Sequence, residues 1–191
     1  MKRLAMIWLV LALLVVIGQV TADTWTGYPN GVGDRTEATP NGAAANWDCC
    51  DETPPDDETT FISTAPAVSP DEDLYALTDP TFDPTDFINS VTVYIRSKRA
   101  TSGDAQPCFK ENGTDTVGSA VGLTAVYANY SQTWTARASD GNNWQYDDIV
   151  ALQAGVKQAA SSGATITTAV YVVVDYTPSI KPQVIIITGD D

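Results

Sequence analysis

The stretch Val170-Tyr171-Val172-Val173-Val174-Asp175-Tyr176 consists almost entirely of β-branched and aromatic residues. Its members alternate between the two sides of an extended chain, which is the period of a β-strand with one face buried. One face carries Val170, Val172, Val174 and Tyr176, and the opposite face carries Tyr171, Val173 and Asp175. The stretch therefore predicts a long strand that contributes one face to an apolar core.

Two earlier segments show the same alternation. In the first, Val91, Val93 and Ile95 share the apolar face, and Thr92, Tyr94 and Arg96 lie opposite. In the second, residues 126–137, one face carries Val126, Tyr130 and Trp134 and the other is polar. Shorter strand-like pieces occupy residues 59–62 and 74–77, and clusters of Gly, Ser, Asn and Asp separate the runs. We predict an all-β fold, an antiparallel jelly-roll β-sandwich.

One segment has helical spacing. Asp147 and Asp148 can cap a helix start, and Ile149, Leu152 and Val156 follow at intervals of three and four. Gly155 is suited to a helix end. This pattern predicts one helix of about two turns at one end of the sandwich.

The N-terminus has the layout of an export signal. Lys2 and Arg3 precede an apolar run from Leu4 to Ile17, and small residues follow up to Ala22. The run is shorter than the roughly 20 residues that span a bilayer. We predict a signal peptide at 1–22, the sandwich at 23–177 and a linker with a terminal strand at 178–191, in a secreted, extracellular protein. The alternative for residues 1–22 is an uncleaved membrane anchor.

Composition excludes several functions. The 191 residues include no histidine, which removes Ser-His-Asp and Cys-His catalysis and the commonest zinc ligands. The net charge of −14 disfavours nucleic acid and anionic membranes as partners. We expect no catalytic residues, no cofactor and no metal.

The three cysteines are Cys49, Cys50 and Cys108. In an exported protein they can form disulfides, and a bridge between adjacent Cys49 and Cys50 would be strained. The pattern predicts that Cys108 pairs with Cys49 or Cys50, contributing roughly 4 kcal/mol to stability by closing a long loop.

The C-terminal segment is apolar on both faces. Pro178 and Pro182 make an extended connector, and the four residues that follow Gln183 are Val184, Ile185, Ile186 and Ile187. Such a strand requires cover, because an exposed one promotes aggregation. It either completes its own sandwich or inserts into the next molecule, and we favour the second, which propagates head to tail as a homopolymer. The strands around Ser90 and Thr168 are the predicted recipient edge.

A family resemblance points the same way. The residues that carry it are 143–149, Leu152-Gln153-Ala154-Gly155-Val156 and Val170 to Tyr176. They resemble the closing half of jelly-roll domains in uncharacterised phage and environmental surface proteins. With the export signal and the apolar tail, the chain resembles subunits of glycan-coated extracellular fibrils. The resemblance covers roughly residues 86–191 and implies a self-assembling structural protein.

Two acceptor patterns predict covalent glycans. Asn112-Gly113-Thr114 and Asn129-Tyr130-Ser131 both fit the N-glycosylation sequence, the first in a predicted turn and the second on a polar strand face. Acidic clusters at 48–58, 71–73 and 79–86 are read as solvated loops rather than calcium sites.

A different kind of function remains open. The chain can be a monomeric secreted carbohydrate-binding module of jelly-roll type, in which exposed aromatic rings stack on sugars. The candidate rings are Trp25, Trp47, Trp134 and Trp144, of which Trp25 and Trp47 are the freer and Trp134 is expected in the core. A virion decoration protein is a third possibility, disfavoured by the export signal.

Overall fold

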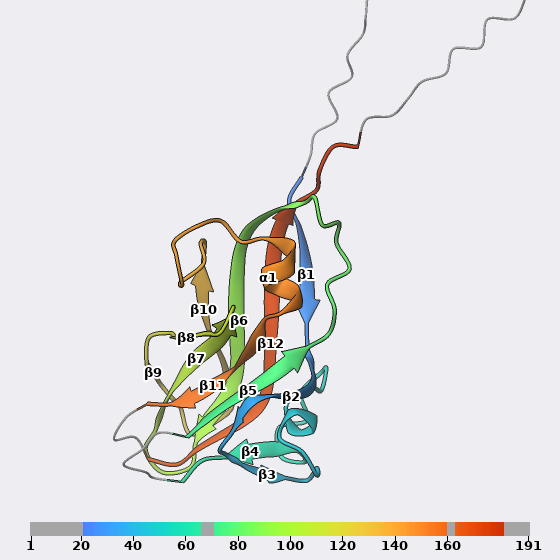
Figure 1. Cartoon of the computed structure of the whole chain (residues 1–191). Coiled ribbons are helices and arrows are strands. Elements are labelled where there is room, and N and C mark those ends of the chain that lie inside the picture. Colours follow the sequence, from blue (N-terminus) through green and yellow to red (C-terminus); the bar gives the residue numbers. More distant parts are fainter. Residues whose placement is uncertain (1–20, 66–70, 160–162, 182–191) are drawn as a thin grey trace, which may run out of the picture.

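The computed structural model describes residues 21–65, 71–159 and 163–181, and these form two antiparallel sheets packed face to face (Figure 1). Sheet A has the order β10-β6-β12-β4-β3, with β1 also paired to β12; its strands are β1 (Asp23–Gly27), β3 (Thr39–Asn41), β4 (Phe61–Ser63), β6 (Phe87–Arg99), β10 (Ala128–Trp134) and β12 (Thr165–Thr177). Sheet B has the order β2-β5-β11-β7-β8, with β9 paired to β7; its strands are β2 (Pro29–Thr36), β5 (Glu72–Leu77), β7 (Asp104–Glu111), β8 (Thr114–Val117), β9 (Val121–Gly122) and β11 (Gln153–Gln158). The predicted all-β sandwich is confirmed.

The core lies between the two sheets, and the alternation read from the sequence selects its members. Val91, Val93 and Ile95 from β6 are fully buried, as are their neighbours Val170 and Val172 from β12. The β6–β12 register sets Ile95 opposite Val170 and Val93 opposite Val172. Cross-strand contacts between such β-branched residues stabilise a sheet, so these two strands form the centre of sheet A.

The predicted helix is shorter than its spacing indicated. Helix α1 (Tyr146–Val150) ends after about one turn, and a 3-10 turn, η1 (Trp47–Cys49), lies elsewhere. Asp148 accepts a hydrogen bond at 2.7 Å from the backbone N–H of Gln145, so the expected acidic helix start is present. The expected helix end at Gly155 is wrong, because Gly155 lies inside strand β11. A Cβ there would lie 1.7 Å from the carbonyl oxygen of Asp73, so close strand packing explains this glycine.

The start of β1 and the end of β12 lie together at one end of the sandwich (Figure 1), with Asp23 paired to Tyr176. The connector after β12 is held against the loop that precedes β6. The backbone N–H of Ser179 donates to Asp86 at 2.8 Å, and the Lys181 ammonium pairs with Asp83 at 2.5 Å. Among the described residues, no helix is long and apolar enough to cross a membrane.

Candidate functional site

Three tyrosines form a row across the outer face of sheet A. Tyr171 and Tyr94 lie directly opposite each other in the β12–β6 register, and Tyr28 follows β1 one residue beyond the Gly27–Val172 pair. The rings of Tyr94 and Tyr171 are stacked with centroids 4.8 Å apart, and the Tyr28 ring is tilted at 6.2 Å from Tyr171. Tyr94 and Tyr171 alternate with buried residues of β6 and β12, so they point away from the core, and Tyr28 lies beside Tyr171 on the same face. We call this row the tyrosine ladder.

An acidic segment, residues 51–60, lies over part of this face, and we call it the acidic loop. The Arg96 guanidinium donates from Nε and Nη2 to the two carboxylate oxygens of Asp57, at 2.5 and 2.6 Å. These hydrogen bonds lower the pKa of Asp57 and raise that of Arg96. Lys98 pairs with Glu58 at 2.5 Å and lies 4.4 Å from the centre of the Tyr127 ring. Two cations of β6 therefore fasten the loop to the sheet.

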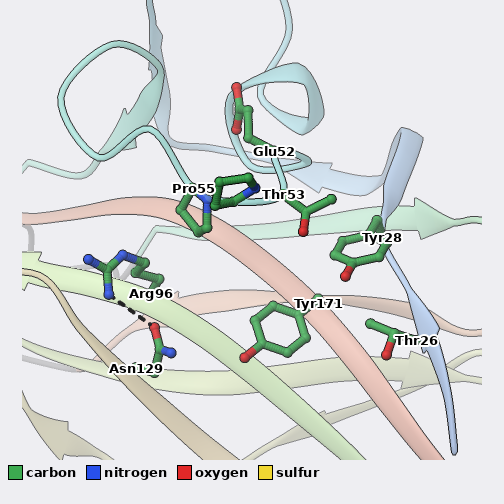
Figure 2. Close-up of a pocket in the computed structure, with 9 residues that line it drawn as sticks. Thr26, Tyr28, Glu52, Thr53, Pro55, Arg96, Asn129 and Tyr171 are labelled. Carbon is green, nitrogen blue, oxygen red and sulfur yellow. Dashed lines mark hydrogen bonds between the residues drawn. The ribbon is translucent and has the colours of Figure 1, made fainter.

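The acidic loop and the tyrosine ladder enclose a pocket of about 500 Å³. Its lining residues are Thr26, Tyr28, Glu52, Thr53, Pro54, Pro55, Arg96, Asn129 and Tyr171. Figure 2 shows Thr53 and Pro55 facing Tyr171 across the pocket, with Tyr28 at one end and Arg96 and Asn129 at the other. Such a volume is in the range typical of small-molecule sites. The pocket thus combines ring and proline surfaces with hydroxyl, amide and guanidinium groups.

The polar groups of the pocket differ in whether the protein already satisfies them. Arg96 is neutralised by Asp57, and its Nη1 donates to the Asn129 Oδ1 at 3.3 Å. Within the described residues, the hydroxyls of Tyr28 and Tyr171 make no hydrogen bond to the protein. Burial raises the pKa of Tyr171, so its hydroxyl remains a donor at neutral pH. The pocket therefore offers hydrogen-bonding groups without an unpaired cation.

The protein satisfies only one of the two carboxylate oxygens of Glu52, because Oε2 is buried and has no hydrogen-bond partner among the described residues. Its carboxylate accepts a hydrogen bond from the Thr60 hydroxyl, and burial raises its pKa. In Figure 2 this carboxylate lies at the far side of Glu52 from Tyr171.

The tryptophans predicted as a sugar-stacking surface lie in or against the core instead. Trp25 and Trp144 are buried, Trp134 packs edge-on against Phe109 as expected of a core residue, and Trp47 packs against the second part of the core. The aromatic surface at the pocket comes from the half-buried tyrosine ladder, which the sequence analysis did not select. The strand alternation in the sequence could have identified two of its members, because Tyr94 and Tyr171 fall on the predicted outward faces of their strands.

The two glycosylation sequences lie in different surroundings and are not brought together. Asn129 lies on β10, is exposed, and borders the pocket. Asn112 lies in the turn between β7 and β8 with a positive φ of 45°, and its Nδ2 donates at 2.8 Å to Asp148, which is buried. Asn112 is also exposed, but its amide nitrogen already donates a hydrogen bond within the protein.

The predicted disulfide is absent: Cys49, Cys50 and Cys108 are free and buried thiols. Cys49 and Cys50 belong to the core between the sheets. On β7, Ala105 and Phe109 point into that core, so Cys108 points to the opposite face of sheet B. Burial strongly raises the pKa of the Cys50 and Cys108 thiols. The intervening sheet separates Cys108 from its two predicted partners.

The acidic clusters are only partly solvated loops. Glu72 and Asp73 lie buried in β5. Asp73 accepts hydrogen bonds from the backbone N–H groups of Glu37 and Ala38 and from the side chains of Asn46 and Tyr75. Its role is to hold the segment after β2 in place. Among the described residues, no three His, Cys, Asp or Glu side chains are arranged to hold a metal ion.

The proposed donor residues Val184, Ile185, Ile186 and Ile187 lie outside the described residues, as does almost all of the predicted signal peptide. The predicted recipient edge is wrong. The strands that contain Ser90 and Thr168 are β6 and β12, which pair with each other in the middle of sheet A. Both strands are therefore interior in the strand order, and residues 87–90 of β6 extend past the end of β10.

No protein-family model and no curated protein matches the chain. Among solved structures, the chain is similar to the CBM22-1 xylan-binding domain of Paenibacillus barcinonensis Xyn10C, with 8% identity over 85% of this chain and 100% of that domain and a TM-score of 0.45. It is also similar to BiXyn10A CBM1 in its apo form (15% identity, 82% and 90% coverage, TM-score 0.37). A CBM28 carbohydrate-binding module specific for non-crystalline cellulose gives 13% identity, 80% and 86% coverage and a TM-score of 0.33. Sequence identities and TM-scores this low carry no inference about ligands, which must come from the residues of this chain.

Proposed function

We propose that this domain is a glycan-binding module that holds a neutral sugar between the tyrosine ladder and the acidic loop. The observation that carries the proposal is the pocket of about 500 Å³, in which the rings of Tyr28 and Tyr171 face Thr53 and Pro55. The export signal predicted at residues 1–22 supports an extracellular location for such a module.

A sugar ring has apolar C–H faces and a rim of hydroxyls, and the pocket offers a partner for each. The tyrosine rings and the two prolines provide flat apolar surface, because an aromatic side chain combines a large contact area with a polar tip. The free hydroxyls of Tyr28 and Tyr171 and the amide of Asn129 can exchange hydrogen bonds with sugar hydroxyls. This combination favours a pyranose over a purely apolar ligand.

The charges favour a neutral sugar. Asp57 occupies two of the donor groups of Arg96, so this guanidinium is not free to form a bidentate pair with a uronate or a phosphate. The chain carries a net charge of −14, which repels anionic polysaccharides.

The pocket is better suited to binding than to hydrolysis. Glycosidases place two carboxyl groups about 5–10 Å apart on either side of the scissile bond. Here Glu52 is the one carboxylate in the lining, and Thr60 already engages it.

The test is calorimetric titration of the chain without residues 1–22, using xylohexaose, cellohexaose and chitohexaose as probes. We expect at least one probe to bind, and Tyr171→Ala to weaken it at least tenfold, or about 1.4 kcal/mol. Thr133→Ala is the matched control, because Thr133 lies on the same sheet face outside the pocket. Absence of binding to all three probes, or equal loss in both variants, would contradict the proposal.

Self-assembly through the C-terminal strand is a second candidate. It is favoured by the connector, whose described residues Ser179 and Lys181 are held at the end of the sandwich by Asp86 and Asp83. A recipient needs an edge strand, and β1 pairs only with β12 among the described strands. We expect filaments by electron microscopy from residues 23–191 and none from residues 23–181 or from Ile186→Asp. Monomers from the longer chain would contradict this assembly.

A further inference from the structure

The pocket that we assign to sugars contains a glycosylation acceptor in its own lining. Asn129 belongs to the sequence Asn129-Tyr130-Ser131 and lies opposite Arg96 in the β10–β6 register. It is exposed, and it lines the same cavity as Tyr171. A sugar attached to this side chain therefore begins inside the cavity rather than on a distant surface.

The carboxamide of Asn129 is oriented for this role. Arg96 Nη1 donates to its Oδ1 at 3.3 Å, while its Nδ2 makes no hydrogen bond to the described protein. N-glycosylation uses only Nδ2, so the bond to Arg96 survives the modification. The other acceptor, Asn112, differs because its Nδ2 already donates to Asp148.

We propose that an N-linked glycan on Asn129 occupies the pocket with its first sugars packed on Tyr171, so that the protein's own glycan excludes free ones. The inference rests on the proposed function, since it requires the pocket to accept sugar. The donor is a lipid-pyrophosphate-linked oligosaccharide. The Asn129 nitrogen forms the new C–N bond at the anomeric carbon, the C–O bond to pyrophosphate breaks, and the amide loses one proton. The unmodified domain then binds free glycans, whereas in the modified domain the attached glycan fills the pocket.

The first experiment isolates the glycan at Asn129. Full-length Thr114→Ala protein, secreted from a glycosylating eukaryotic cell line, retains Asn129 in the only remaining acceptor sequence and leaves the Asn112 side chain intact. Peptide mass spectrometry should show sugar on Asn129. An Asn129 that carries none in this protein would overturn the proposal.

The second measurement is the rate at which peptide N-glycosidase removes this glycan from the native protein. We expect Tyr171→Ala to raise the rate at least tenfold and Thr133→Ala to leave it unchanged, because only Tyr171 lines the pocket. Tyr28→Ala is a second pocket variant, and thermal unfolding confirms that each variant is folded. Equal rates in the folded variants would overturn the proposal.

Ser131→Ala separates this inference from the proposed function, since it removes the sugar while Asn129 stays in place. With xylohexaose, cellohexaose and chitohexaose as probes, we expect Ser131→Ala to bind and the glycosylated protein to bind at least tenfold more weakly. Equal binding by both proteins would overturn the inference but leave the proposed function standing. Failure of Ser131→Ala to bind any probe would overturn the proposed function, and the glycosidase rates would still decide whether the glycan is held.

Discussion

The outer faces of the two sheets arise from the same strand alternation but are covered in different ways. On sheet B, Leu74 and Cys108 lie on the outer face and are fully buried, since both flank Gly155, which has no side chain. Ion pairs cover them: Glu72 pairs with Lys157 at 2.8 Å and Arg35 with Asp115 at 2.6 Å. Asp34 also joins Lys110 at 2.6 Å. Each of these charged groups is paired with an opposite charge within the protein, although Glu72 Oε1 has no hydrogen-bond partner among the described residues.

On sheet A the covering segment leaves a cavity. The acidic loop is fastened at Asp57 and Glu58, while its other end, at Thr53 and Pro55, stands away from Tyr171. Hydroxyls and an amide are therefore left for a ligand. If the proposed function holds, sheet B serves stability and sheet A serves binding, and substitutions on the two faces should have different consequences.

The largest effect is expected at the centre of sheet B. Gly155→Ala forces a Cβ against the carbonyl of Asp73, and we expect a loss of about 4 kcal/mol in unfolding free energy. Urea denaturation measures this loss. Gly31→Ala is the control, because its added Cβ would lie 3.6 Å from the Ala76 methyl group, an ordinary contact. Comparable stabilities of the two variants would contradict the close packing of β11 and β5.

Glu72→Gln should cost about 2 kcal/mol, because it leaves the cations of Arg35 and Lys157 without their nearly buried partner. Asp34→Asn, which removes a more exposed ion pair, should cost less than Glu72→Gln. Both variants should bind sugar as the wild type does, since neither residue lines the pocket. If either variant lost sugar binding without losing stability, the conclusion that sheet B contributes to stability and not to binding would be contradicted.

A smaller effect is expected when the Arg96–Asp57 hydrogen bonds that hold the acidic loop on sheet A are lost. The pKa of Asp57 lies below its ordinary value because Arg96 donates hydrogen bonds to it. A lowered acid pKa stabilises the folded form above the unfolded pKa near 3.9, and this contribution disappears as pH falls through the folded pKa. We expect the Arg96 Nε resonance in NMR spectra to report loop release below about pH 4. In Asp57→Asn the loop should already be released at pH 7, and the Arg96 Nε resonance should show no change as the pH is lowered.

The smallest effect is expected from reducing agent. Because the three thiols are free, dithiothreitol should leave the unfolding midpoint unchanged. Alkylation with iodoacetamide after unfolding without reductant should add three carbamidomethyl groups by intact mass. Addition of a single group would instead show that two of the cysteines are joined, as the predicted Cys108 disulfide requires.

Local patterns predicted the strands well. The period of two along residues 90–96 and 170–176 identifies both the strands and their buried faces, because each side chain's direction follows from its neighbours in the chain. The helix after Asp147 was overestimated for the same local reason. Ile149, Leu152 and Val156 have helical spacing, but Ala154 and Val156 also have strand spacing, and pairing of β11 with β5 and β7 decides between them.

The site was harder to predict, because it depends on which outward face another segment covers. Trp25 and Trp47 were expected to be the freer tryptophans, yet Trp25 lies in the core and Trp47 packs against it. Nothing local distinguishes Tyr171 from any other tyrosine on an outward strand face. Its importance arises because Tyr28, 143 residues earlier in the chain, and the acidic loop lie beside it.

The amino-acid sequence by itself determined the all-β class, the two central strands and the inward direction of Val93 and Val172, since these follow from alternation within a few residues. Only the tertiary structure decided that Cys108 faces away from Cys49 and Cys50, and that Asn129 borders a pocket. The physical reason is that strand order and loop placement result from long-range pairing and burial, which bring together groups that are far apart in the chain.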